Sequence, residues 1–146
     1  MEVNTYVHHF FSVTATQNLL PMCGFVAAGF PSPAADYIDE KLDLNEYCII
    51  NRAATFIVRV SGDSMEGAGI FDGDIAIIDR SLTSRHNDII IGVVEGEFTI
   101  KRLVLHGLDV WLYPENTRFQ PIKITEYSEF RVWGVVTRVI HSFGKR

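Results

Sequence analysis

The feature that most constrains this chain is a series of short β-branched and aromatic runs that recurs between turn residues from residue 47 to residue 140. Val, Ile, Thr, Tyr, Phe and Trp favour extended backbone, whereas Gly, Pro, Asn and Asp favour turns. Glu95-Gly96-Glu97 places a glycine between two runs, as a tight hairpin requires. The pattern predicts a mostly β domain, with strands at residues 47–50, 55–60, 74–79, 88–94, 98–105, 110–113 and 130–140.

The residues before this series differ in composition. Small residues and prolines dominate residues 21–33, where fixed proline φ values and flexible glycines favour extended chain and turns over packed helix. This stretch predicts an exposed, flexible N-terminal arm. One short helix is allowed after it, because Ser32 can cap a helix and Pro33 suits its first position. The apolar side of that helix would consist of Tyr37, Ile38 and Leu42.

Composition narrows the classes of function. With 146 residues the chain fits one compact domain plus an arm. Its formal net charge of −5 argues against direct nucleic-acid binding, which needs clustered Lys and Arg, so any link to DNA is expected to run through a partner. Cys23 and Cys48 form no C-x-x-C pair, and neither a disulfide framework, a metal site nor a cofactor is indicated. Without a secretory or membrane-spanning apolar run, we expect a cytoplasmic protein.

A candidate nucleophile lies where one predicted strand ends, in Val60-Ser61-Gly62-Asp63-Ser64-Met65-Glu66-Gly67. A turn of small residues can present the Ser64 hydroxyl next to backbone N–H groups that are free to bind an oxyanion, with Asp63 and Ser64 forming that turn. The stretch is not a G-x-S-x-G motif, because Glu66 stands where the last glycine should be. It is not an S-x-x-K motif either, because Gly67 stands where the lysine should be. Alternatively, Ser64 simply caps a helical turn.

A candidate base lies in the predicted strand at residues 98–105. By strand alternation Lys101 shares a face with Thr99, and Arg102 lies on the other face, so periodicity alone leaves open which cation points inward. Arginine stays protonated, whereas a desolvated lysine can lose its proton. Of the two, only Lys101 could therefore activate a hydroxyl.

The histidines offer an alternative arrangement. His86 or His106, with Asp88 or Asp109, could complete a Ser-His-Asp set around Ser64. The order of these residues along the chain matches no known triad order, and histidines near turns are more often solvated. This alternative is disfavoured.

Three stretches together resemble the UmuD-like branch of the LexA-type self-cleaving serine peptidases, including plasmid-borne relatives. They are Ala28-Gly29-Phe30-Pro31-Ser32-Pro33-Ala34-Ala35-Asp36-Tyr37, then Ser61-Gly62-Asp63-Ser64-Met65 with Asp72-Gly73-Asp74, and Gly96-Glu97-Phe98-Thr99-Ile100-Lys101-Arg102-Leu103. Ser64 follows Gly29 by 35 positions and Lys101 follows Ser64 by 37, as in UmuD relatives. The likeness covers residues 28–141.

The resemblance implies a fold of twisted antiparallel sheets in which Ser64 attacks the carbonyl of Ala28 and Lys101 takes the hydroxyl proton. The Ala28-Gly29 bond would break autocatalytically through an acyl-enzyme, without metal or cofactor. It further implies stimulation by the RecA filament on single-stranded DNA, after which the shortened homodimer joins an error-prone Y-family polymerase. Cys23-Gly24 is an alternative cleavage site, disfavoured because it lacks the 35-position spacing.

The resemblance also implies an organisation in three parts: an arm of residues 1–28, a linker of residues 29–45, and a peptidase domain of residues 46–146. Three alternative functions make different demands on the sequence. A LexA-type repressor should carry a helix-turn-helix domain before the peptidase, and a signal-peptidase-like processor should carry a membrane anchor, and neither feature is found in the sequence. In a non-enzymatic, β-rich interaction module, Ser64 would be incidental.

Overall fold

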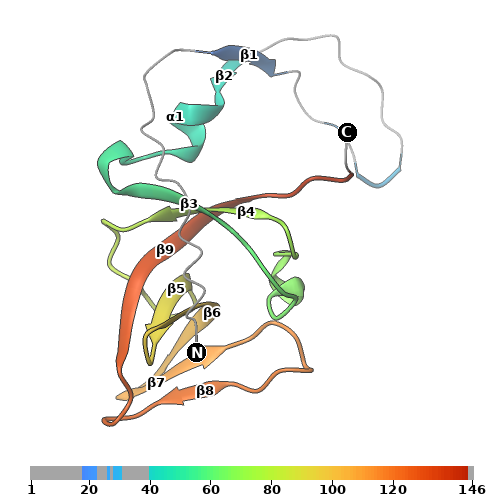
Figure 1. Ribbon diagram of the computed structural model, residues 1–146. Helices are drawn as coiled ribbons and strands as arrows, with labels where there is room; N and C mark the ends of the chain where they lie inside the picture. The colour runs from blue at the N-terminus through green and yellow to red at the C-terminus, as the bar shows by residue number, and fades with distance from the viewer. Residues whose placement is uncertain (1–17, 23–25, 27, 31–39, 145–146) are drawn as a thin grey trace, which may run out of the picture. The chain divides into compact units, whose positions relative to one another are not determined.

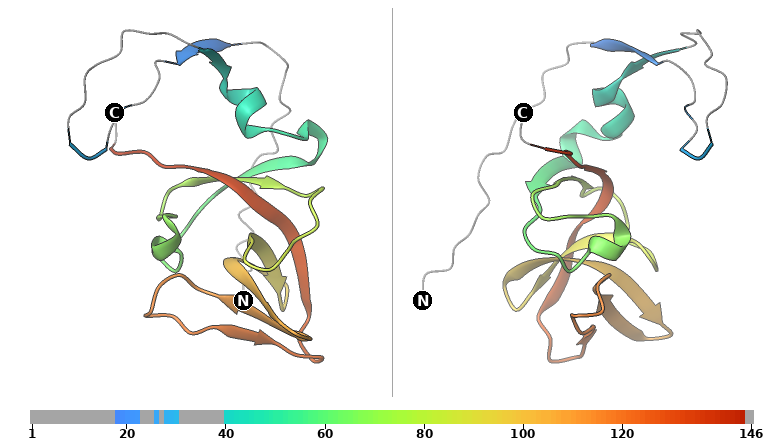
Figure 2. Two further views of the ribbon diagram at one scale, coloured as in Figure 1. Left: turned by 180° about the vertical axis from the view of Figure 1, so that it is seen from behind. Right: turned by 90° about the vertical axis from the view of Figure 1, so that its right-hand side faces the viewer.

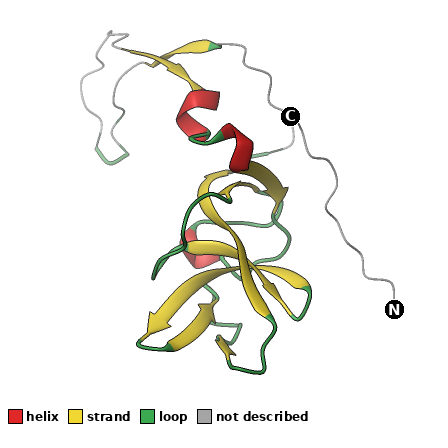
Figure 3. Ribbon diagram, turned by 90° about the vertical axis from the view of Figure 1, so that its left-hand side faces the viewer, coloured by secondary structure: helices red, strands yellow, loops and turns green. Residues whose placement is uncertain are grey.

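The computed structural model describes residues 18–22, 26, 28–30 and 40–144 of the chain. The described residues form two compact units that divide after Ile50 (Figure 1). Strands account for most of the regular structure, and the helices are short (Figure 3). The predicted mostly β fold class with antiparallel sheets is confirmed.

The smaller unit is a strand pair followed by one helical segment. Strand β1 (Leu19–Met22) pairs antiparallel with β2 (Glu40–Asp43), and α1 (Leu44–Cys48) follows directly. Asp43 ends the strand and begins the helix, because its Oδ1 accepts a hydrogen bond of 2.8 Å from Asn45 N. Pairing of β1 with β2 places Met22 opposite Glu40.

Two predictions for this unit were wrong. Residues 47–50 form no strand, because the Asp43 cap commits the following residues to α1, and this local hydrogen bonding outweighs the β propensity of Tyr47 and Ile49. The predicted helix does not reach Leu42, which lies in β2 opposite Leu20. The start of that helix, at Ser32 and Pro33, lies outside the described residues.

The larger unit is a seven-stranded antiparallel sheet in the order β3-β4-β9-β5-β6-β7-β8 (Figures 1 and 2). Strand β9, the last in sequence, lies between β4 and β5 and pairs with both. The strands are β3 (Thr55–Arg59), β4 (Ile75–Asp79), β5 (Ile89–Val94), β6 (Glu97–His106), β7 (Asp109–Tyr113), β8 (Ile122–Ile124) and β9 (Phe130–Ile140), with 3-10 helices η1 (Arg52–Ala54) and η2 (Glu66–Ala68).

Six of these strands match predicted strands to within one residue at either end. Strand β8 was not predicted, because three residues at the edge of a sheet are too few to show alternation. The predicted hairpin after β5 is confirmed. Glu95 and Gly96 have φ values of 49° and 80°, the two positive values of a type I′ turn, and this turn sets the register that pairs Ile90 with Lys101.

Two apolar clusters hold the larger unit together. One comprises Val60, Met65, Ile70 and Ala76, and the other comprises Ile90, Leu103, Leu112 and Val135. Met65 is 1% exposed, and burying a side chain of this size contributes about 1.5–3 kcal/mol. Because Met65 directly follows Ser64, this burial anchors the backbone at the candidate nucleophile.

Strand β9 passes β4 closely at Gly134. A Cβ added to Gly134 would lie 2.4 Å from Cγ2 of Ile78, a fully buried and branched side chain that cannot rotate away. A Cβ on Gly92, the neighbouring buried glycine in β5, would meet its nearest atom at 3.1 Å, and that atom is the ring edge of Phe130. The two glycines therefore differ in how much surrounding structure must move.

We expect Gly134→Ala to lower the free energy of unfolding by about 1–3 kcal/mol, because overpacking displaces strand β4. Gly92→Ala, the matched control, should cost less, since the Phe130 ring can shift. Urea unfolding followed by circular dichroism measures both values. Equal losses for the two variants would contradict close packing at Gly134.

Candidate active site

Ser64 lies in the turn between β3 and β4, which is fixed at both ends. Val60 N donates to Asp74 O at 2.8 Å, and Gly73 N donates to Val60 O at the same distance. Inside the turn the Met65 side chain is buried, while Ser64 is half-buried. Helix η2 begins after Met65 and has no side-chain cap, so Ser64 does not serve as a helix cap.

Lys101 reaches Ser64 from strand β6. Its Nζ lies 2.9 Å from Ser64 Oγ, 3.1 Å from Thr99 Oγ1 and 2.9 Å from Ile100 O. Three acceptors match the three N–H groups of an ammonium ion. Once the amine is neutral, its lone pair can accept the Ser64 proton along the same 2.9 Å contact.

The surroundings of Lys101 favour the neutral amine. Lys101 is half-buried, and burial lowers its pKa from the ordinary value of 10.5 because the charged form loses hydration. No carboxylate pairs with Lys101 among the hydrogen bonds and ion pairs of the described residues, so nothing there offsets this loss. The shift therefore goes in the direction that a lysine base requires.

The structure decides which of the two neighbouring cations faces Ser64. Arg102 lies on the other face of β6, where its guanidinium pairs with Glu115 and donates to Asn87 O at 2.7 Å. Thr99 shares the face of Lys101, as alternation predicts, and holds the amine through its hydroxyl. The sequence indicated that these residues share a face, but not that Thr99 contacts Lys101.

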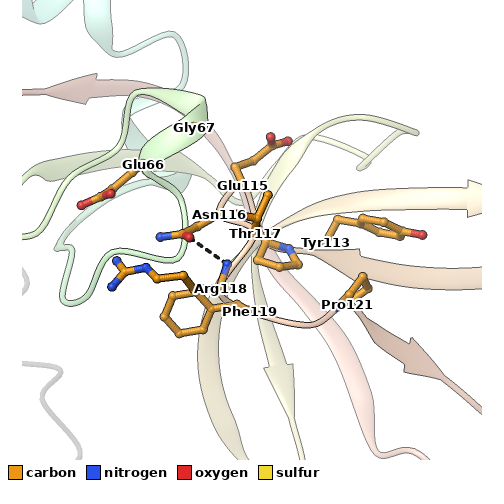
Figure 4. A pocket seen from close by; sticks show the side chains of 10 residues that line it. Glu66, Gly67, Tyr113, Glu115, Asn116, Thr117, Arg118, Phe119 and Pro121 are labelled. Carbon is orange, nitrogen blue, oxygen red and sulfur yellow. Dashed lines mark hydrogen bonds between the residues drawn. The ribbon is translucent and has the colours of Figure 1, made fainter.

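The segment after β7, with Glu115 and Asn116 (Figure 4), binds the backbone of the nucleophile turn, which comprises Asp63 and Ser64. Glu115 N donates to Ser64 O at 2.8 Å, and Gly67 N donates to Glu115 O at 2.7 Å. Asn116 Nδ2 donates to Asp63 O at 2.9 Å. Gly67 permits this approach, because a Cβ there would lie 2.5 Å from Glu115 O.

These contacts orient two backbone N–H groups. In a trans peptide the carbonyl and the N–H of the same unit point in opposite directions, and the described residues contain no cis peptide. Asp63 O and Ser64 O both face the segment after β7, so the N–H groups of Ser64 and Met65 face away from it. Among the described residues neither N–H has a hydrogen-bond partner, and both are available to bind an oxyanion.

Comparison with known proteins shows the family of the chain. The family model of Peptidase S24-like proteins matches residues 21–137. The chain is 48% identical over 115 residues to protein ImpA of Escherichia coli, covering 78% of this chain and 77% of ImpA. It is 45% identical over 113 residues to protein MucA of Salmonella typhimurium, covering 77% of each chain.

The chain belongs to the peptidase S24-like family. It is also 35% identical over 127 residues to the LexA repressor of Bordetella avium, covering 87% of this chain and 59% of that repressor. The predicted membership of the UmuD-like, LexA-type group is thereby confirmed.

The alternative histidines of this S24-like protein are engaged elsewhere in the described part of the chain. His86 Nδ1 accepts from Leu105 N at 3.0 Å, and its ring lies 6.3 Å from the ring of His106. Asp88 Oδ2 accepts from Arg85 N at 2.7 Å. Asp109 pairs with Lys123 at 3.3 Å. None of these groups bonds to Ser64, so the structure supplies no Ser-His-Asp set from them.

The predicted cleavage bond of this S24-like protein belongs to the smaller unit. Ala28 and Gly29 are exposed in a bend, and a Cβ on Gly29 would meet nothing within 4 Å. Phe30, the next residue, is 94% exposed. The alternative Cys23-Gly24 bond lies outside the described residues. No helix in the described ranges is both long and apolar enough to cross a membrane.

Proposed function

We propose that this chain is a self-cleaving serine peptidase in which Ser64 is the nucleophile and Lys101 the general base. The observation that carries the proposal is the 2.9 Å contact between Ser64 Oγ and Lys101 Nζ, at a lysine whose pKa burial lowers. Membership of a peptidase family supports it independently.

The proposed reaction cuts the Ala28-Gly29 bond in two steps. In the first, Ser64 Oγ attacks the Ala28 carbonyl carbon while Lys101 Nζ takes the hydroxyl proton, and the Ser64 and Met65 N–H groups bind the oxyanion. Lys101 then returns the proton to the Gly29 nitrogen as the C–N bond breaks, leaving Ala28 esterified to Ser64. In the second step, Lys101 takes a proton from a water molecule as the water oxygen attacks the ester carbonyl. The bond between this carbon and Ser64 Oγ then breaks, Lys101 returns the proton to Ser64 Oγ, and Ala28 leaves as a carboxylic acid that loses its proton to solvent.

The lowered pKa of Lys101 determines how fast this chemistry can run. An ordinary lysine, with a pKa of 10.5, is neutral in roughly one molecule per three thousand at pH 7. Each unit by which burial lowers the pKa raises the neutral fraction about tenfold. The half-buried position of Lys101 thus raises the fraction of neutral amine above that of a solvated lysine.

We expect Ser64→Ala and Lys101→Arg each to abolish self-cleavage of the folded chain. Ser64→Ala removes the attacking oxygen, and Lys101→Arg keeps the charge but cannot deprotonate, so its rate should fall by about 10²–10⁴-fold. Lys123→Arg, in exposed strand β8, is the matched control and should cleave like the unchanged chain. Gel electrophoresis over time measures each rate.

The same reaction should depend on pH in one direction. Because the neutral amine is the reactive form, the rate should rise about tenfold per pH unit below the lowered pKa of Lys101 and level off above it. A rate that stays flat between about pH 6 and 10 would contradict Lys101 as the base. Normal cleavage by Lys101→Arg would do the same.

The bond that we propose to be cut is Ala28-Gly29, and activated RecA filament on single-stranded DNA should stimulate the cut. Ala28 and Gly29 are exposed, which leaves the bond between them accessible to a second surface, and their spacing from Ser64 resembles that of UmuD relatives. Mass spectrometry should find a stable fragment that begins at Gly29, formed faster with the filament than without it. Ser64→Ala, incubated in the same way, should stay intact, whereas a fragment beginning at Gly24 would assign the cut to Cys23-Gly24.

The processed chain is proposed to act in the bacterial cytoplasm as a homodimeric subunit of an error-prone Y-family polymerase in the DNA-damage response. Support comes from the resemblance to UmuD and from a formal net charge of −5, which disfavours direct DNA binding.

We expect the fragment from Gly29 onward to co-purify with such a polymerase as a dimer, and to bind bare duplex DNA weakly at physiological salt. Pull-down and fluorescence anisotropy measure the two properties. Tight, salt-sensitive binding of the fragment to duplex DNA would overturn this role and favour a repressor.

A further inference from the structure

The side-chain amide of Asn116 donates one hydrogen bond and accepts another. Its Nδ2 donates to Asp63 O at 2.9 Å, and its Oδ1 accepts from Arg118 N at 3.0 Å (Figure 4). The second bond stabilises a local turn, in which Phe119 N also donates to Asn116 O at 3.1 Å. Only the first bond leaves this turn and reaches the nucleophile turn.

We propose that Asn116 is a positioning residue for the oxyanion site, acting through the peptide unit that joins Asp63 to Ser64. This inference rests on the proposed function. Because the unit is trans, holding Asp63 O toward Asn116 directs the Ser64 N–H to the opposite side, where the oxyanion forms. Rotation of the unit would carry that N–H away from the oxyanion while leaving the Ser64 side chain in place.

The bond also strengthens the donor electronically. A hydrogen bond accepted by a peptide carbonyl polarises the peptide unit, and the N–H of that unit becomes a better donor. Glu115 N acts in the same way on Ser64 O and hence on the Met65 N–H, but it is a backbone group that no side-chain substitution removes. Asn116 is therefore the side chain through which the oxyanion site can be altered without touching Ser64 or Lys101.

Arg118 contacts the same turn but does not fulfil this role. It pairs with the Asp63 carboxylate rather than the carbonyl, and the two side chains are 67% and 34% exposed. Exposed ion pairs of this kind contribute little, because water screens them. The contact between Asn116 and the backbone is half-buried and fixes a peptide plane, which the side-chain pair cannot do.

Three variants of the full chain separate the two bonds of Asn116. Asn116→Asp retains an oxygen that accepts from Arg118 N, but it replaces the donor to Asp63 O with a second oxygen. Asn116→Ser also retains an acceptor for the local turn, cannot reach Asp63 O, and adds no charge. Thr117→Asp, at the exposed neighbouring position, adds the same charge as Asn116→Asp and leaves both bonds intact.

The rate of self-cleavage is measured against pH for each variant, together with urea unfolding. Both Asn116 variants should lower the plateau rate by about 10- to 100-fold, because losing an oxyanion donor outright costs about 10²–10³-fold. The pH midpoint of Asn116→Ser, which adds no charge, should stay unchanged because Lys101 keeps its surroundings, and Thr117→Asp should match the unchanged chain. Equal rates in the Asn116 variants and Thr117→Asp, or a shifted midpoint in Asn116→Ser, would overturn the positioning role.

A second readout keeps this proposal distinct from the proposed function. A fluorophosphonate probe bonds to Ser64 Oγ with loss of fluoride and places its own oxygen in the oxyanion site, so mass spectrometry can follow it without self-cleavage. If the unchanged chain never cleaves, the proposed function fails. Slower labelling of both Asn116 variants, but not of Thr117→Asp, would still support the positioning role, and equal labelling would overturn it.

Discussion

The pairing of strand β9 with both β4 and β5 is the constraint on which the rest of the larger unit depends. Ser64 lies in the turn between β3 and β4, whereas Lys101 lies on β6, which pairs with β5. Strand β9 is the only strand of the seven-stranded sheet that joins these two halves. Because it is the last strand in sequence, the contact between Ser64 and Lys101 forms only after a long loop has been closed.

Lys101 shows how this sheet accommodates a group that would be more stable in water. Because side chains alternate along a strand, one of the adjacent residues Lys101 and Arg102 faces the nucleophile turn. Arg102, on the other face, pairs with the carboxylate of Glu115. Among residues that the structure describes, the Lys101 amine bonds instead to three neutral oxygens. Partial burial without an opposite charge disfavours the ammonium form of Lys101 and so lowers its pKa. Such an environment is expected at sites that need a base.

The nucleophile turn is held by its surroundings rather than by its own sequence. Met65 anchors it from the core, and Glu115 and Asn116 bind its carbonyl groups from a segment about fifty residues away. Within the described part of the chain, the N–H groups of Ser64 and Met65 have no hydrogen-bond partner, and the engaged carbonyls of the preceding residues fix the direction in which these groups point. Other elements thus fix the peptide planes of the nucleophile turn, and these planes orient the N–H groups of Ser64 and Met65 before any substrate binds.

Periodicity and turn chemistry alone determined the β class, six of the strands and the hairpin at Glu95-Gly96, because these depend on residues close together in the chain. The sequence motifs and the spacing between them also identified Ser64 as the candidate nucleophile and Lys101 as the candidate base. Tertiary structure decided that Lys101 faces inward, that Thr99 holds its amine and that Asn116 reaches Asp63. The contacts of Lys101 and Asn116 depend on packing between distant segments, of which a one-dimensional pattern carries no record. Helix α1, which overlaps a predicted strand, is by contrast set locally, because the Asp43 cap outweighs the β propensity of the residues after it.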